Sequence, residues 1–263
     1  MKVLKDEVYT FLKTNGASLV GVANVERFQG APRGHHPADF VPGARSVVTF
    51  GIALLRTTLN WEDHLGESEF VPPEHRKDVL QNYLYSETGY VLVNHLLDML
   101  GLRLAGLLQD KGFASLFFPA TYGRGAMVEY IQKRIPHGLG LLSQRHAAVR
   151  AGLGEFGLNN IVVTPKYGPR IRFSSVITEA ELEPSPLLEE KACLGENCSI
   201  CLRDCPGAIT LRENFDPAAV WIDPPAQTDI VFCRSRWNID YCWGRCIKVC
   251  PVGARRRQQS TAA

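Results

Sequence analysis

Cysteine is absent from most of this 263-residue chain, and all eight cysteines lie between Cys193 and Cys250. The chain starts MKVLKDEVYTFLK and lacks the apolar core of a secretory signal. Disulfides form in oxidising compartments, which secreted proteins reach through such a signal. We therefore expect a cytoplasmic protein whose cysteines stay reduced.

Long apolar runs and a large charge of one sign are absent as well. The most apolar segment, residues 89–108, is interrupted by four polar residues, Asn94, His95, Asp98 and Arg103. Such interruptions argue against a membrane span. The net charge of +2 argues neither for nor against a polyanionic partner. We expect no membrane partner, and we do not favour a nucleic-acid partner.

The cysteines form two runs, and each run ends in Cys-Pro. The first run reads Cys193-x4-Cys198-x2-Cys201-x3-Cys205-Pro206, and the second reads Cys233-x8-Cys242-x3-Cys246-x3-Cys250-Pro251. In two-cluster ferredoxins the fourth cysteine of each run ligates the other cluster. By that rule one [4Fe–4S] cluster takes Cys193, Cys198, Cys201 and Cys250, and the other takes Cys205, Cys233, Cys242 and Cys246. Zinc sites favour short cysteine pairs with a spacer, which is not this pattern.

Hydrophobic periodicity indicates an α/β region before the cysteines. It predicts helices over 3–15, 74–111, 127–133 and 143–150, and strands over 18–23, 46–54, 113–118, 160–164 and 171–178. The turn over 165–169 is expected to join the last two strands as a hairpin. Pro184 and Pro186 indicate a boundary between a domain over 1–185 and one over 186–263.

The segment Gly152-Leu-Gly154-Glu-Phe-Gly157 matches the pattern G-x-G-x-x-G. The dinucleotide fingerprint requires a strand before these glycines and a helix after them. Here a helical pattern precedes the glycines and a strand follows, so the match does not predict NAD binding. The glycines indicate that the backbone closely approaches a neighbouring strand or a flat ligand.

Several segments carry a resemblance to a known superfamily. They read GVANVERF at 21–28, PGARSVV at 42–48, AGLGEFGLNN at 151–160, GPRIR at 168–172 and CRSRWNID at 233–240. Together they resemble the corrinoid-binding core shared by epoxyqueuosine reductases and reductive dehalogenases. The resemblance extends over about residues 17–254 of the chain.

The resemblance implies a nitroreductase-like α/β domain that holds cobalamin, followed by a ferredoxin-like domain with the two clusters. It assigns cofactor contacts to the glycine loop and its surroundings, namely Gly152, Gly154, Gly157, Asn159, Asn160 and Arg170. Turn and capping roles are equally open for the last three. Electrons would come from a low-potential donor of the ferredoxin or flavodoxin type and reduce a small-molecule substrate.

One departure from the epoxyqueuosine reductases concerns the proton donor. Those enzymes carry an aspartate shortly before the Ala-Gly-Leu-Gly run, but residues 135–146 here contain neither Asp nor Glu. This departure argues against tRNA as the substrate. The candidate donors are then His137 and Tyr122, which lie in glycine-rich segments and have side chains suited to proton transfer. The structural alternatives are that Tyr122 is a packed aromatic ring and that His137 is a loop histidine with its hydrogen bonds made within the protein.

We therefore interpret the sequence as a corrinoid-dependent iron–sulfur oxidoreductase with an unassigned substrate. One alternative is an electron-transfer protein whose α/β region serves for docking. A second is a protein that reduces or carries cobalamin, and a third is a tRNA epoxyqueuosine reductase. An open, ligand-sized cavity at the glycine loop would favour an enzyme over an electron-transfer protein.

The crossed ligation can be tested by removing one cysteine. Anaerobic protein is expected to hold about eight iron and eight sulfide per chain. Replacing Cys205 with alanine should disturb the cluster of the second run and spare the cluster held by Cys193, Cys198 and Cys201. Iron analysis and EPR of the reduced protein measure this effect. About four iron per wild-type chain, or zinc in place of iron, would contradict the assignment.

Overall fold

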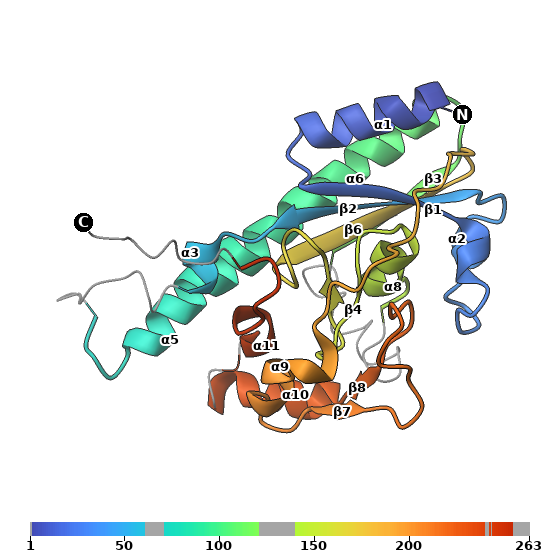
Figure 1. The fold of residues 1–263 in the computed structure, drawn as a ribbon. Helices are drawn as coiled ribbons and strands as arrows, with labels where there is room; N and C mark the ends of the chain where they lie inside the picture. Colours follow the sequence, from blue (N-terminus) through green and yellow to red (C-terminus); the bar gives the residue numbers. More distant parts are fainter. Residues whose placement is uncertain (1, 61–70, 121–139, 240–241, 243, 255–263) are drawn as a thin grey trace, which may run out of the picture.

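The computed structural model describes residues 2–60, 71–120, 140–239, 242 and 244–254. Its centre is a four-stranded sheet with the strand order β1-β2-β6-β3 (Figure 1). The strands are Leu19–Asn24 (β1), Ser46–Ala53 (β2), Ser115–Phe118 (β3) and Ile171–Thr178 (β6). All neighbouring strands are antiparallel, and β6 lies between β2 and β3. The expectation of a mixed α/β architecture is confirmed.

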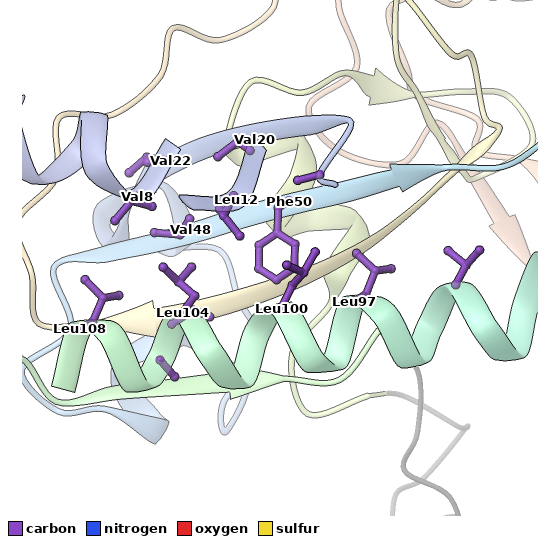
Figure 2. Packing of buried hydrophobic residues seen from close by; sticks show 14 of the residues in the cluster. Val8, Leu12, Val20, Val22, Val48, Phe50, Leu97, Leu100, Leu104 and Leu108 are labelled. Carbon is purple, nitrogen blue, oxygen red and sulfur yellow. The ribbon is translucent and has the colours of Figure 1, made fainter. Parts of the chain in front are cut away.

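One face of the sheet is covered by α1 (Lys2–Thr14) and α6 (Leu92–Asp110) (Figure 1). Side chains alternate across a strand, so Val48 and Phe50 of β2 point to the same face. Figure 2 shows them packed with Leu97 and Leu104 of α6, and all four side chains are fully buried. This cluster is the larger hydrophobic core of the sheet and fixes the two helices on it.

The opposite face of the sheet is covered by α8 (Gln144–Arg150). Val47 and Ile177 point to this face and form a second core with Ala147, Phe156 and other residues. The chain after α8 forms the short hairpin of β4 (Glu155–Phe156) and β5 (Val162–Val163). The second core therefore anchors the glycine loop to the sheet.

The cysteine-rich part lies on the α8 side of the sheet (Figure 1). Its elements are short: η4 (Gly195–Asn197), α9 (Ile200–Arg203), β7 (Ile209–Leu211), β8 (Ala226–Thr228), α10 (Ile230–Ile239) and α11 (Arg245–Lys248). Strands β7 and β8 pair with each other. Three further short helices lie nearer the N-terminus, η1 (Val25–Phe28), α2 (Pro37–Phe40) and α3 (Arg56–Leu59).

The long helix expected over 74–111 contains a change of helix type. It consists of α5 (Arg76–Leu80), the π-helical η2 (Gln81–Val91) and α6. π-Helix is rare and occurs mostly as single-turn bulges, which are often found at functional sites. By length and composition the part from 83 to 110 could cross a membrane, and 44% of its most apolar window is buried. Core helices have the same properties, and this helix supplies Leu97 and Leu104 to the core.

Most predicted elements are confirmed within a few residues, but the hairpin over 160–178 is wrong. Strand β5 pairs with β4, whereas β6 pairs with β2 and β3. The turn closes on itself, with two backbone hydrogen bonds between Thr164 and Gly168. The buried strand β6 pairs with β2 over eight residues and with β3 over four, and the two-residue β5 cannot offer the same burial. The helix expected over 127–133 lies outside the described residues.

Truncation of a core leucine should show how much the packing of α6 contributes to the free energy of unfolding. Leu104→Ala should lower the free energy of unfolding by about 2–5 kcal/mol, because the fully buried side chain leaves a cavity. Leu102→Ala on the same helix is the control: Leu102 is 53% exposed, and surface changes usually stay within about 0.5 kcal/mol. Denaturant titration measures both values. Similar losses for the two variants would contradict this description of the core.

Candidate functional site

The cysteines gather into two sets of four, which we term the first and second thiol sets. The first set lines a small pocket and consists of Cys193, Cys198, Cys201 and Cys250. The second set lines a larger cavity and consists of Cys205, Cys233, Cys242 and Cys246. Each set combines three cysteines of one run with the last cysteine of the other. The structure thus brings together the same two groups of cysteines that the sequence spacing predicts. Ligation of iron by these cysteines stays a prediction.

Burial and mutual repulsion raise the pKa of thiols in both sets. The pKa of Cys201 rises to about 11, first through burial and then through Cys193, Cys250 and Cys198. The pKa of Cys246 rises to about 12, again mainly through burial and then through neighbouring thiols. Four thiolates in one such pocket require a positively charged partner. Iron in a cluster provides this charge, and soft thiolates are its usual ligands.

The spacing of the thiols does not suit a single metal ion. Within the described part of the chain, no three His, Cys, Asp or Glu side chains form a group that could hold one ion. A zinc ion needs its thiolates about 2.3 Å from one point. The thiolates of a [4Fe–4S] cluster bind different iron atoms of a larger body, so they can stand further apart. None of the eight cysteines, all of which the structure describes, forms a disulfide, and all are partly exposed. Four thiols at each pocket match the number of ligands that a [4Fe–4S] cluster needs, and the presence of the clusters stays a prediction.

The cavity of the second thiol set is large enough for more than a cluster. Its volume is about 510 Å³, within the usual range of about 300–1,000 Å³ for small-molecule and cofactor sites. Tyr85 and Tyr90 of the π-helical η2 line one part of it, and Arg145, Asn160 and Ile161 line another. The long helix borders this cavity without filling it.

Two polar residues, Asn160 and Arg145, line this cavity beside each other. Asn160 has φ +57°, and its Nδ2 donates to the Thr228 hydroxyl at 3.1 Å. Its Oδ1 is buried and has no hydrogen-bond partner in the described structure, which is costly unless a donor arrives. Arg145 donates to the Asn160 carbonyl, and burial lowers the pKa of its guanidinium. The cavity therefore offers a free acceptor beside a cation.

The three glycines of the loop approach the protein's own chain. A Cβ on Gly152, which has φ +73°, would lie 1.9 Å from the Pro186 carbonyl oxygen. A Cβ on Gly154 would lie 2.5 Å from the Val163 carbonyl oxygen, and one on Gly157 would lie 2.7 Å from the Val163 side chain. Neighbouring chain thus accounts for the need for glycine. Cofactor contact by these three residues stays a prediction.

Asn159 and Arg170 contact the cysteine-rich segment. The Asn159 Nδ2 donates to the Cys246 carbonyl at 3.1 Å. Arg170 is 6% exposed and donates to the carbonyls of Ile247 at 3.1 Å and Cys250 at 2.8 Å, and also to that of Val252. Both side chains therefore hold backbone beside the thiols, and their contact with a corrinoid stays a prediction.

Glu155 is a site residue that the sequence interpretation missed. It is fully buried, and its Oε1 accepts the backbone N–H of Ala192 at 2.6 Å and of Cys193 at 2.7 Å. Its Oε2 accepts the Trp221 N–H at 2.9 Å. Lys191 lies 3.7 Å away as an ion-pair partner. The available signal was one acidic residue within the otherwise uncharged run AGLGEFGLNN.

The candidate proton donors Tyr122 and His137 lie outside the described residues. The pKa of His146, which is next to Arg145 in the chain, is lowered to about 4, first through burial and then through the charges of Arg145 and Arg150. His146 is therefore neutral at pH 7. Tyr85 lines the cavity, and burial raises the pKa of its phenol.

The chain is similar in sequence to two families of reductases, although no protein-family profile matches it. It is 40% identical over 96 residues to a tetrachloroethene reductive dehalogenase of Dehalobacter restrictus, covering 35% of this chain and 17% of that protein. It is 34% identical over 116 residues to an epoxyqueuosine reductase of Listeria monocytogenes, covering 43% of this chain and 30% of that protein. The chain thus matches less than a third of the length of these relatives.

The fold is similar to solved structures of the same two families. The epoxyqueuosine reductase of Streptococcus thermophilus has a TM-score of 0.56 at 17% identity, over 95% of this chain and 66% of that one. A catabolic reductive dehalogenase with bound 3-bromo-4-hydroxybenzoic acid has a TM-score of 0.58 at 18% identity, over 94% and 31%. Sequence relatives and structural neighbours therefore agree. The chain is thus similar in sequence to parts of reductive dehalogenases and epoxyqueuosine reductases, and similar in fold to both.

Proposed function

We propose that this protein is an oxidoreductase that uses two [4Fe–4S] clusters and a cobalamin to reduce a substrate that is still unassigned. The observation that carries the proposal is the cavity of the second thiol set. It combines four thiols with a partnerless amide oxygen and a buried cation in about 510 Å³. The relatives named above are reductases, and one similar solved structure is described as suggesting a mechanism for B12-dependent dehalogenation.

The two thiol sets would hold the two clusters, and cobalamin would lie beside the second. When bound, these groups supply the electrons of the reduction. The Cys201 thiol of the first set contributes to the raised pKa of Cys246 in the second set, so these two thiols lie close enough to interact. The path for electrons then runs from the first set through the second set into the cavity.

Arg145 and Asn160 would orient the cofactor. Cobalamin carries carboxamide arms, and each arm offers one N–H donor group and one carbonyl. An amide N–H would satisfy the Asn160 Oδ1, which has no partner in the described structure. The Arg145 guanidinium would donate to an amide carbonyl. Tyr85 and Tyr90 would contribute apolar ring surface on the side of η2.

The open cavity favours an enzyme over a pure electron-transfer protein. A docking protein has no need for a ligand-sized space next to its cluster. The long helix borders this space with Tyr85, Ser86, Tyr90 and Val91 and leaves it open. A protein that only reduces or carries cobalamin would also have such a cavity, and turnover of an organic substrate distinguishes the two.

A modified tRNA is the second candidate substrate, beside a small molecule. Epoxyqueuosine reductases are among the sequence relatives. A solved member, similar to this chain with a TM-score of 0.50 at 19% identity, is bound to a tRNA stem loop. The expectation against a nucleic-acid partner therefore has no support from the relatives. The missing carboxylate over 135–146 argues in the other direction.

Cobalamin binding can be measured directly. Added cob(II)alamin should change its EPR spectrum on binding to anaerobic wild-type protein. Arg145→Gln should weaken binding by about 10-fold or more, since a hydrogen bond from a charged group contributes about 1.5–3 kcal/mol. Arg103→Gln is the matched control, because Arg103 bonds to Asn15 on the far face of the sheet.

The same titration decides between the proposal and electron transfer. If high concentrations of wild-type protein leave the cob(II)alamin spectrum unchanged, the corrinoid part of the proposal is wrong. Equal weakening by Arg145→Gln and Arg103→Gln would place the cofactor elsewhere.

The identity of the acid can be read from the pH dependence of turnover. With His137 as donor, an ordinary pKa of about 6.5 means that turnover falls as pH rises from about 6 to 8. His137→Gln should then slow turnover by about 10²–10⁴-fold. With Tyr122 as donor, the rate should stay flat to about pH 9, and Tyr122→Phe should carry the loss. Turnover within a few-fold of wild type for both variants would show that neither residue is the acid.

A further inference from the structure

We propose that Glu155 and Arg170 are positioning residues that complete the first thiol set by holding its two ends, Cys193 and Cys250. The inference rests on the proposed function because it assumes that this set holds a cluster. Its observations are independent of the cobalamin, since they concern only how the α/β part holds the cysteine-rich segment.

The first thiol set depends on contacts between distant parts of the chain. Cys198 and Cys201 follow Cys193 closely through the short η4 and α9. Cys250 arrives from the far end of the segment, beyond α11. Local turns can position three of the four thiols, but only tertiary contacts can bring Cys250 to the others. The two ends of the segment therefore have to be fixed from outside.

Glu155 fixes the first end. Its carboxylate accepts the N–H of Cys193 at 2.7 Å and the N–H of Ala192 at 2.6 Å through the same oxygen. Its other oxygen binds the N–H of Trp221, which holds the carboxylate in place. Hydrogen bonds to an ionised acceptor are shorter and stronger than neutral ones. The fully buried Glu155 therefore fixes the backbone on which the Cys193 thiol is mounted.

Arg170 fixes the second end with the opposite charge. Its guanidinium donates to the carbonyls of Cys250 and Ile247 and also to that of Val252. The turn before it supports the same segment, because a Cβ on Gly168 would lie 2.0 Å from the Val252 carbonyl oxygen. The Glu155 carboxylate thus accepts hydrogen bonds from backbone N–H groups at the Cys193 end. The Arg170 guanidinium donates hydrogen bonds to backbone carbonyls at the Cys250 end.

Asn159 provides a contrast within the same stretch of chain. Its amide donates to the Cys246 carbonyl, and Cys246 belongs to the second thiol set. Loss of this contact should therefore disturb the second set first. The comparison separates a specific positioning role from a general loosening of the segment.

The experiment compares four variants of the anaerobic holoprotein with the wild type. Glu155→Gln turns one acceptor oxygen into a donor that faces backbone N–H groups. Arg170→Lys keeps the charge but loses the planar group that reaches three carbonyls. Both should lower iron from about eight toward about four per chain. EPR of the reduced protein should show that both lose the same cluster signal, whereas Asn159→Ala should lose the other. Asp223→Asn, at the exposed Arg150–Asp223 pair, should keep both signals.

Circular dichroism and thermal melting establish that each variant is folded. If Glu155→Gln does not fold, Glu155→Asp replaces it. This variant keeps the buried charge, shortens the reach by one methylene, and should give the same selective loss in milder form. The inference would be overturned if Glu155→Gln and Arg170→Lys lost both cluster signals together. It would also be overturned if neither variant lost a signal. Wild-type protein without iron would overturn the proposed function as well, whereas eight iron without cobalamin binding would leave this inference standing.

Discussion

Four partly buried thiols lie together at each of two pockets, and the rest of the chain has to hold them there. Burial and repulsion raise the pKa of Cys201 to about 11 and of Cys246 to about 12. Without a positive partner these thiols stay protonated at neutral pH, and the proposed iron would supply that positive charge. Most of the remaining architecture can be understood as a means to bring the thiols together from distant parts of the chain.

One stretch of chain, residues 155–170, meets most of this requirement. It contributes Glu155 and Arg170 to the first thiol set and Asn159 to the second. The same stretch supplies Asn160 and its partnerless amide oxygen to the large cavity. The second core fixes the start of this stretch to the sheet. A single anchored segment thus links the thiol sets to the cavity, so changes in it should affect both.

Sequence patterns predicted the parts of the molecule that have a local signature. Strands β1, β2, β3 and β6 and the main helices follow hydrophobic periodicity, and the two thiol sets follow the cysteine spacing. The hairpin over 160–178 was wrong because pairing is decided by neighbours distant in sequence. Glu155 was missed for the same reason, since its partners Cys193 and Trp221 are far along the chain. Hydrophobic periodicity does not distinguish the π-helix η2 from the α-helices on either side of it.

The central claim is that the second thiol set and the cobalamin share one cavity. The most direct test is the EPR spectrum of wild-type protein that carries cob(II)alamin and reduced clusters at the same time. Two unpaired spins in one cavity of about 510 Å³ should interact. The cobalt signal and one cluster signal should therefore both be broadened relative to protein carrying either centre alone. A spectrum equal to the simple superposition of the separate signals would contradict the account.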